Sequence, residues 1–131
     1  MVTTKQHFSI FKKEFLKWVE VWGLKDFHYT FAHDDTEMSY AQIEPVMTGR
    51  RFDVTLSTEI PDDEFKSRTA NEFMKHLAFH ECAECLLSGL RTIATERTFS
   101  EADLDREAHG VINRLQNAVQ FNNDILKGKS K

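Results

Sequence analysis

One long apolar stretch constrains the fold of this chain more than any other feature. Residues 70–95 predict a single helix whose apolar side chains cover nearly its whole circumference. A helix that is apolar on all sides is normally a buried one, so we expect it at the centre of a domain. Yet His76, His80 and Glu84 follow one another at intervals of four residues, which puts them on one narrow stripe. Because a buried carboxylate is costly unless it is paired or bound to a metal, this stripe is a candidate functional site.

The segments before this helix predict an α+β fold. Apolar residues at helical spacing within 5–22 predict an amphipathic N-terminal helix, which ends at Gly23 and packs on the protein's own core. Alternating apolar and polar residues predict a small, mostly antiparallel sheet of three strands, the last two joined as a hairpin. The three strands are expected at 27–33, 38–46 and 51–58.

Capping signals indicate where the two later helices begin. Thr69 and Glu72 match a capping box, which places the start of the central helix. Ser100 and Asp103 repeat the pattern and open a last helix that runs to about residue 126 and returns antiparallel to the central one. The sequence thus predicts two long helices joined by a short connection.

Length, charge and hydropathy narrow the class of protein. The 131 residues are enough for one domain, 1–131, in which 127–131 are expected to form a flexible tail. The net charge of −4 provides no basic surface for nucleic acid. The sequence has neither a membrane-spanning apolar run nor an apolar signal segment at its start. We therefore expect a soluble cytoplasmic protein without nucleic-acid or membrane partners.

The central helix carries the pattern H-E-x-x-E, which begins at His80 and Glu81. In the zinc-protease pattern H-E-x-x-H, side chains four residues apart hold the metal, and the intervening Glu deprotonates a metal-bound water. Here the second ligand is Glu84, a carboxylate in place of an imidazole, and both are competent zinc ligands. Glu81 is then the candidate catalytic base.

A catalytic zinc ion needs a third protein ligand, and the predicted helix hairpin offers one. If the last two helices fold back on each other, His109 comes level with the turn that holds Glu84. His80, Glu84 and His109 are therefore the predicted ligands of Zn²⁺ or another divalent cation. Glu107 and His76 are alternative ligands, or partners that orient a ligating histidine.

With these residues, the order of elements resembles a minimal form of the zincin metallopeptidases, above all the gluzincin branch and small zincin-like proteins of bacteria and phages. The likeness in order covers most of the chain, and the specific motif covers 76–109. The resemblance implies a zinc-dependent hydrolase, specifically a peptidase, with His80 as a ligand, Glu81 as the base and His109 as the ligand from the next helix. It also implies that the strand at 52–58 lines a substrate cleft and pairs with an extended polypeptide.

Two alternatives remain open at this site. Glu84 stands where the family has a second histidine, which favours a non-catalytic zincin-like module that docks on another protein. The second alternative contains no metal: Glu84 pairs with Arg91 or Arg114, and His80 is a hydrogen-bonded core residue. Metal content separates the hydrolase from both alternatives.

The remaining reactive residues are expected to be structural. Cys82 and Cys85 form a C-x-x-C pair, but they lie in mid-helix, away from the helix N-terminus that would activate a thiol. We predict that both are core residues; an enzyme of another class that uses this pair is a third hypothesis. Either Tyr29 or Tyr40 is a candidate to stabilise an oxyanion. Three further histidines are expected on the surface or in turns: His7, His28 and His33.

Overall fold

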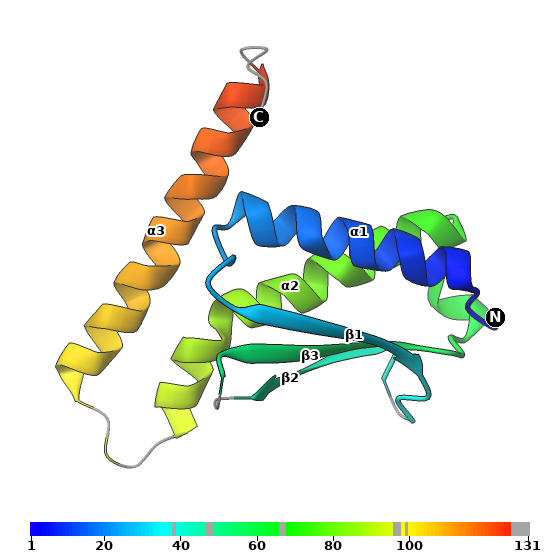
Figure 1. Ribbon diagram of the computed structural model, residues 1–131, viewed down its shortest axis with the longest axis horizontal. Coiled ribbons are helices and arrows are strands. Elements are labelled where there is room, and N and C mark those ends of the chain that lie inside the picture. The colour runs from blue at the N-terminus through cyan, green and yellow to red at the C-terminus, as the bar shows by residue number, and fades with distance from the viewer. Residues whose placement is uncertain (38, 47–48, 66–67, 96–97, 99, 127–131) are drawn as a thin grey trace.

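The computed structural model describes residues 1–37, 39–46, 49–65, 68–95, 98 and 100–126, with side chains as far as residue 119. Within these residues the fold is α+β, as predicted, with three α-helices and one small sheet (Figure 1). The helices are α1 (Lys5–Val21), α2 (Ala70–Thr95) and α3 (Glu101–Leu126), and a short 3₁₀ helix, η1, spans Asp62–Phe65. The strands are β1 (His28–Asp34), β2 (Ala41–Val46) and β3 (Arg51–Ser57). The predicted tail at 127–131 lies outside the described residues.

The sheet is mixed, so the prediction of a mostly antiparallel sheet was wrong. Its strand order is β1-β3-β2: β3 pairs antiparallel with β2, as a hairpin requires, and parallel with β1. Strand β3, the last in the sequence, therefore lies between β1 and β2. The pattern of each strand fixes which side chains face the core but not which strand becomes its neighbour.

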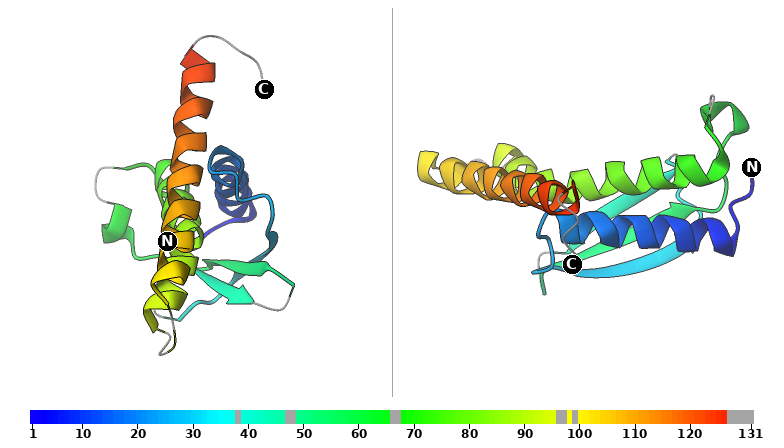
Figure 2. Two further views of the ribbon diagram at one scale, coloured as in Figure 1. Left: turned by 90° about the vertical axis from the view of Figure 1, so that its left-hand side faces the viewer. Right: turned by 90° about the horizontal axis from the view of Figure 1, so that it is seen from above.

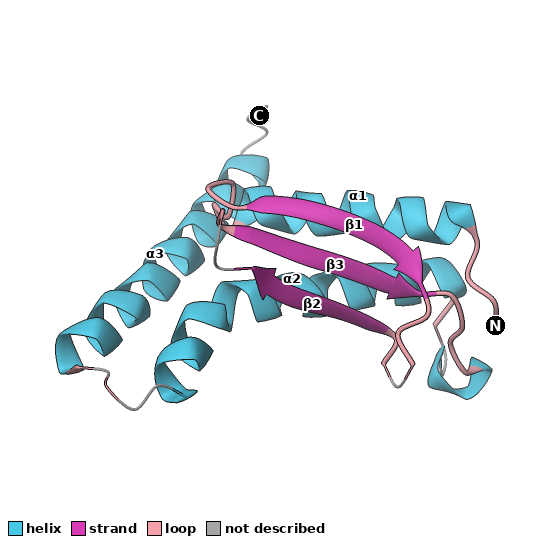
Figure 3. Cartoon of the chain, turned by 60° about the horizontal axis from the view of Figure 1, so that its bottom comes forward, coloured by secondary structure: helices cyan, strands magenta, loops and turns pink. Residues whose placement is uncertain are grey.

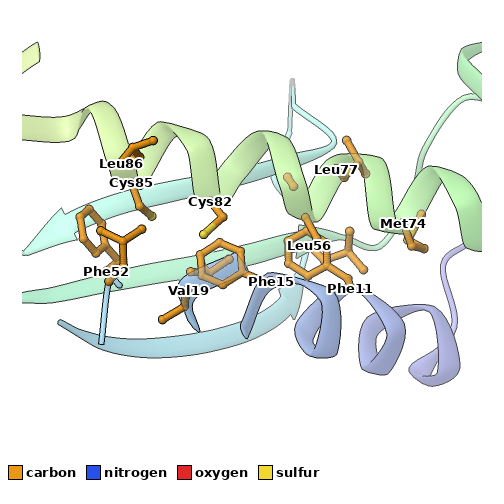
Figure 4. Packing of buried hydrophobic residues seen from close by; sticks show 14 of the residues in the cluster. Phe11, Phe15, Val19, Phe52, Leu56, Met74, Leu77, Cys82, Cys85 and Leu86 are labelled. Carbon is orange, nitrogen blue, oxygen red and sulfur yellow. The ribbon is translucent and has the colours of Figure 1, made fainter. Parts of the chain in front are cut away.

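Helices α1 and α2 cover the same face of the sheet, and the core lies between these two layers (Figure 3). Apolar side chains of α1, of the sheet and of α2 are almost fully buried there (Figure 4). They include Phe11, Phe15 and Val19 of α1, Phe52 and Leu56 of β3, and Met74, Leu77, Cys82 and Cys85 of α2. Full burial of one such large side chain stabilises the fold by roughly 1.5–3 kcal/mol. This arrangement confirms that α1 packs inward and that the cysteines are core residues.

The capping signals hold in the structure. The backbone amide of Glu72 donates to Thr69 Oγ1 at 3.2 Å, and the amide of Thr69 donates to the Glu72 carboxylate at 2.9 Å. Ser100 and Asp103 make the same reciprocal pair at 3.1 Å each. Both long helices therefore begin where the sequence predicted.

Helix α2 is not buried on all sides, contrary to the sequence expectation. Phe79 packs against Trp18 and Trp22 at the end of α1 but remains 41% exposed, and Leu87 is 41% exposed as well. Helix α3 does not cover α2 along its length, because it diverges from α2 and extends past the end of α1 (Figures 1 and 2). Helix α2 thus carries more apolar side chains around its circumference than the fold buries.

Contacts with α2 and with the turn after α1 hold the described part of α3. Near its start, the carboxylate of Glu107 lies against Gly89 of α2, in space that a Cβ at that position would need. Further along, the guanidinium of Arg114 donates to the carbonyl oxygen of Gly23, the residue with positive φ that follows α1.

Among the described residues, no helix has the length and apolar content needed to cross a membrane.

Candidate functional site

The predicted ligand pair, His80 and Glu84, lies on an accessible side of α2. His80 Nε2 is 3.7 Å from Glu84 Oε1, as expected for residues four apart on a helix. The two side chains are 61% and 30% exposed, so the prediction that this stripe is buried was wrong. The other oxygen of Glu84 pairs with the guanidinium of Arg91. This ion pair is the one that the metal-free alternative anticipated.

The third predicted ligand does not join this pair. His109 is exposed on α3, and its Nδ1 lies 2.7 Å from the carbonyl oxygen of Asp105 in its own helix. Glu107 faces Gly89, a full turn beyond Glu84 along α2. Within the described part of the chain, no three His, Cys, Asp or Glu side chains form a group that could hold a metal ion. As arranged, the donor set does not fit a zinc ion, which needs three protein ligands.

Glu81, the predicted base, is the buried acid of α2. Only 8% of this residue is exposed, because its helical neighbours one turn away on either side, Leu77 and Cys85, face the core. Burial raises the pKa of the Glu81 carboxyl to about 7, and the negative charge of Glu84 adds to the increase. No described residue donates a hydrogen bond to this carboxyl. A buried acid to which no described residue donates a hydrogen bond is a sign of a functional site.

Glu81 forms part of the wall of a pocket of about 450 Å³. Helix α2, the start of β2 and the segment around η1 contribute its lining. The lining residues are Ser39, Tyr40, Ala41, Glu64, Arg68, Phe73, His76, Leu77, His80 and Glu81. The pocket therefore contains three of the residues that the sequence singled out on α2.

Two more groups in this pocket have shifted pKa values. Desolvation lowers the pKa of His76, and the charges of Arg68 and His80 lower it further. The side-chain hydrogen bond to Glu64 raises the pKa of Tyr40. At neutral pH the pocket thus presents a neutral imidazole and a phenol beside the buried acid.

A second pocket, of about 320 Å³, continues along the same two elements. Ile43 and Pro45 of β2 form one side, and Glu84, Ser88, Arg91, Thr92 and Thr95 of α2 form the other. Both pockets therefore lie between β2 and α2. We call the two together the β2–α2 groove.

Strand β2 is an edge of the sheet and leaves backbone groups available beside this groove. The amide of Ser57 donates to the carbonyl of Tyr40 at 2.9 Å, so Tyr40 directs its backbone groups toward β3. Because the direction alternates along an antiparallel pair, the backbone groups of Ala41, Ile43 and Pro45 point away from β3. Proline, which has no N–H, occupies one of these outward positions without loss to the ladder. No described strand pairs with this edge.

The strand that was predicted to pair with a peptide, 52–58, cannot do so. Strand β3 has β1 on one side and β2 on the other, so both of its edges are already paired. The free edge beside α2 belongs to β2, which sequence reasoning did not assign to the site. Pro45 was the available signal, because proline within a strand is typical of edge strands.

Of the other candidates, only Tyr40 lies in the groove. Tyr29 donates from its hydroxyl to the Leu24 carbonyl at 2.7 Å, and burial raises its pKa, whereas Tyr40 lines the first pocket. Both cysteines are buried free thiols, and burial raises the pKa of Cys82 to about 12. The three other histidines are structural or exposed: His7 takes part in the capping of α1, His33 stacks on Phe8 and contacts Thr3, and His28 lies on the surface.

Comparisons of the chain with protein-family models, with curated proteins and with solved structures find no match. The groove and its residues are therefore the evidence for its functional class.

Proposed function

We propose that the protein is a zincin-like binding module that takes an extended segment of another polypeptide into the β2–α2 groove. One observation carries the proposal: Glu81, a buried acid to which no described residue donates a hydrogen bond, lines a pocket directly beside the edge of β2 that no described strand pairs with. Exposed strand edges recruit extended peptides through backbone hydrogen bonds, and neighbouring pockets select their side chains.

The dimensions of the groove support an extended occupant. The first pocket adjoins Tyr40 and Ala41, and the second adjoins Ile43 and Pro45. Alternate residues of a strand are about 7 Å apart and point to the same side. A segment added to β2 therefore directs every second side chain toward α2, into one pocket and then the other.

Binding without turnover is favoured over hydrolysis because the ligand set is incomplete. Glu84 is neutralised by Arg91, and His109 is exposed on a helix that diverges from α2. A zinc-dependent peptidase is the second candidate. The pairing of His80 with Glu84 favours it, and so does the pKa of Glu81 near 7, which suits an acid or base that works at neutral pH.

A backbone substitution tests strand addition directly. Ile43→Pro removes the outward amide of β2 but leaves the hydrogen bonds to β3, and Ile43→Val is the matched control that keeps the amide. We expect short peptides of alternating Thr and Ala, with a varied central residue, to shift the amide resonances of Ala41 and Ile43. The affinity of these peptides for Ile43→Pro should be lower by about tenfold or more, which corresponds to a loss of about 1.4 kcal/mol or more of binding free energy. If no peptide shifts any β2 resonance, the proposal is wrong.

Metal content separates the two candidates. Elemental analysis of untagged protein should find no stoichiometric zinc, and Glu84→Ala and His109→Ala should not alter that result. About one zinc per chain, lost in both variants, would instead establish a three-ligand site and favour the peptidase. In that case Glu81→Gln becomes the control for a protease assay, because it removes the base but keeps the shape of the side chain.

A further inference from the structure

The first pocket combines a buried acid with aromatic and aliphatic walls. Glu81 is more than nine-tenths buried, and no described residue donates a hydrogen bond to it. Tyr40, Phe73 and Leu77 line the same pocket. A buried acid in the wall of a pocket favours a ligand that donates hydrogen bonds to it.

The formal charge of this pocket favours a cation. Glu64 and Glu81 contribute two carboxyl groups, and Arg68 is the one permanent cation among the described residues of the lining. The Arg68 residue is exposed, so its charge is screened by solvent, whereas Glu81 is screened much less. The second pocket differs, since its carboxylate, Glu84, already has Arg91 as a partner.

We propose that the first pocket receives a lysine or arginine side chain of the bound segment, whose ammonium or guanidinium group donates hydrogen bonds to Glu81. This inference rests on the proposed function, because the polypeptide brings the side chain to the pocket. The methylene stem packs beside Leu77 and Phe73, and the half-buried ring of Tyr40 attracts a cation. An uncharged side chain fills the same space but leaves the buried acid without a partner.

The preference for a cationic side chain applies to one position of the bound segment. Side chains of an extended segment reach the groove at every second residue. The residue beside Ala41 meets Glu81, and the next residue that points toward α2 meets the pocket in which Glu84 is already neutralised. One position should therefore require a positive charge, and the following position should not.

Peptides that differ only in the central residue test this preference by fluorescence anisotropy. Alternating Thr-Ala peptides carry Lys, Arg, norleucine or Glu at the centre; norleucine keeps the stem of lysine without its charge. The Lys and Arg peptides should bind about tenfold or more tightly than the norleucine peptide, as expected for pairing a buried carboxyl. Glu81→Gln should abolish this difference, and Glu84→Gln, the matched control in the second pocket, should preserve it. Equal affinity of the Lys and norleucine peptides for the unaltered protein would overturn the inference.

A small-molecule titration separates this inference from the proposed function. Butylamine, which is a cation at neutral pH, should shift the amide resonances of Tyr40 and Leu77 in the unaltered protein, whereas butanol should not. If butylamine does so and no peptide binds, the cation pocket stands and the polypeptide function is wrong. If peptides bind but butylamine and butanol act alike, the polypeptide function stands and the cation pocket is wrong. Both assays use the unaltered chain, so neither depends on the folding of a variant.

Discussion

Replacing Glu81 by Gln should change the pH dependence of stability in a defined direction. The folded protein keeps the carboxyl protonated up to about pH 7, whereas the unfolded chain loses this proton near 4.5. Between these values the folded state binds more protons than the unfolded state, so Glu81 makes stability fall as the pH rises. The penalty is absent below the unfolded pKa and complete above the folded one.

The size of this penalty follows from the shift of pKa. A shift from 4.5 to about 7 corresponds to about 3 kcal/mol, because each pKa unit is equivalent to about 1.4 kcal/mol. Gln fills the same space and carries no charge. Relative to the unaltered protein, Glu81→Gln should therefore gain about 3 kcal/mol of unfolding free energy between about pH 4 and about pH 8.

Urea denaturation over this pH range, with a chelator present, measures the difference directly. Other titrating groups are common to both proteins and cancel in the subtraction. Glu59→Gln, at an exposed carboxylate, is the matched control for the loss of one carboxyl group. A difference for Glu81→Gln that does not change with pH would show that Glu81 is ionised and solvated in the folded state, and would refute the argument for a buried acid.

Three further predictions concern the fold around the groove. Gly23→Ala should lower the free energy of unfolding by about 1–2 kcal/mol in urea denaturation, because φ is +65° there and a Cβ would come within 2.9 Å of the side chain of Asn117; unchanged stability would contradict the left-handed turn after α1. Cys82 and Cys85 should resist dithionitrobenzoate in the folded protein and react in urea, since burial raises the pKa of both thiols; rapid reaction of the folded protein would revive the hypothesis of a thiol enzyme. Thr69→Ala should cost about 1 kcal/mol by removing a helix cap, with Thr69→Ser as the control that retains it.

The helices could be predicted well from the sequence because their signals are local. A capping box needs only residues three apart, and Thr69 with Glu72 provides both of its hydrogen bonds. Gly23 ends α1 through its own backbone conformation. None of these features depends on where the rest of the chain lies.

The order of the strands could not be predicted in the same way. The alternation of β1 and of β3 is equally compatible with parallel and antiparallel neighbours, since both arrangements bury the same face. Only Pro45 carried information on order, because it indicates an edge strand. The resemblance to zincins assigned the peptide-pairing edge to β3, but both edges of β3 are paired in the structure.

The part of the site that depends on local spacing was predicted, and the part that depends on how the helices pack was not. His80 and Glu84 lie together because a spacing of four residues fixes it. Whether Glu81 or Glu84 is buried depends on which side of α2 faces α1 and the sheet, and a helix apolar on all sides does not reveal this. The position of His109 depends on the angle between α2 and α3, which arises from contacts such as Glu107 against Gly89.

Hydrogen exchange along β2 tests the proposed groove most directly. In the free protein the amides of Ala41 and Ile43 point away from β3 and should exchange with solvent quickly. Saturation with the lysine-centred peptide should protect both amides strongly and leave unchanged the outward amide of Phe31 on the opposite edge strand, β1. Unprotected Ala41 and Ile43 amides in the peptide-saturated protein would contradict the claim that the β2–α2 groove binds an extended polypeptide.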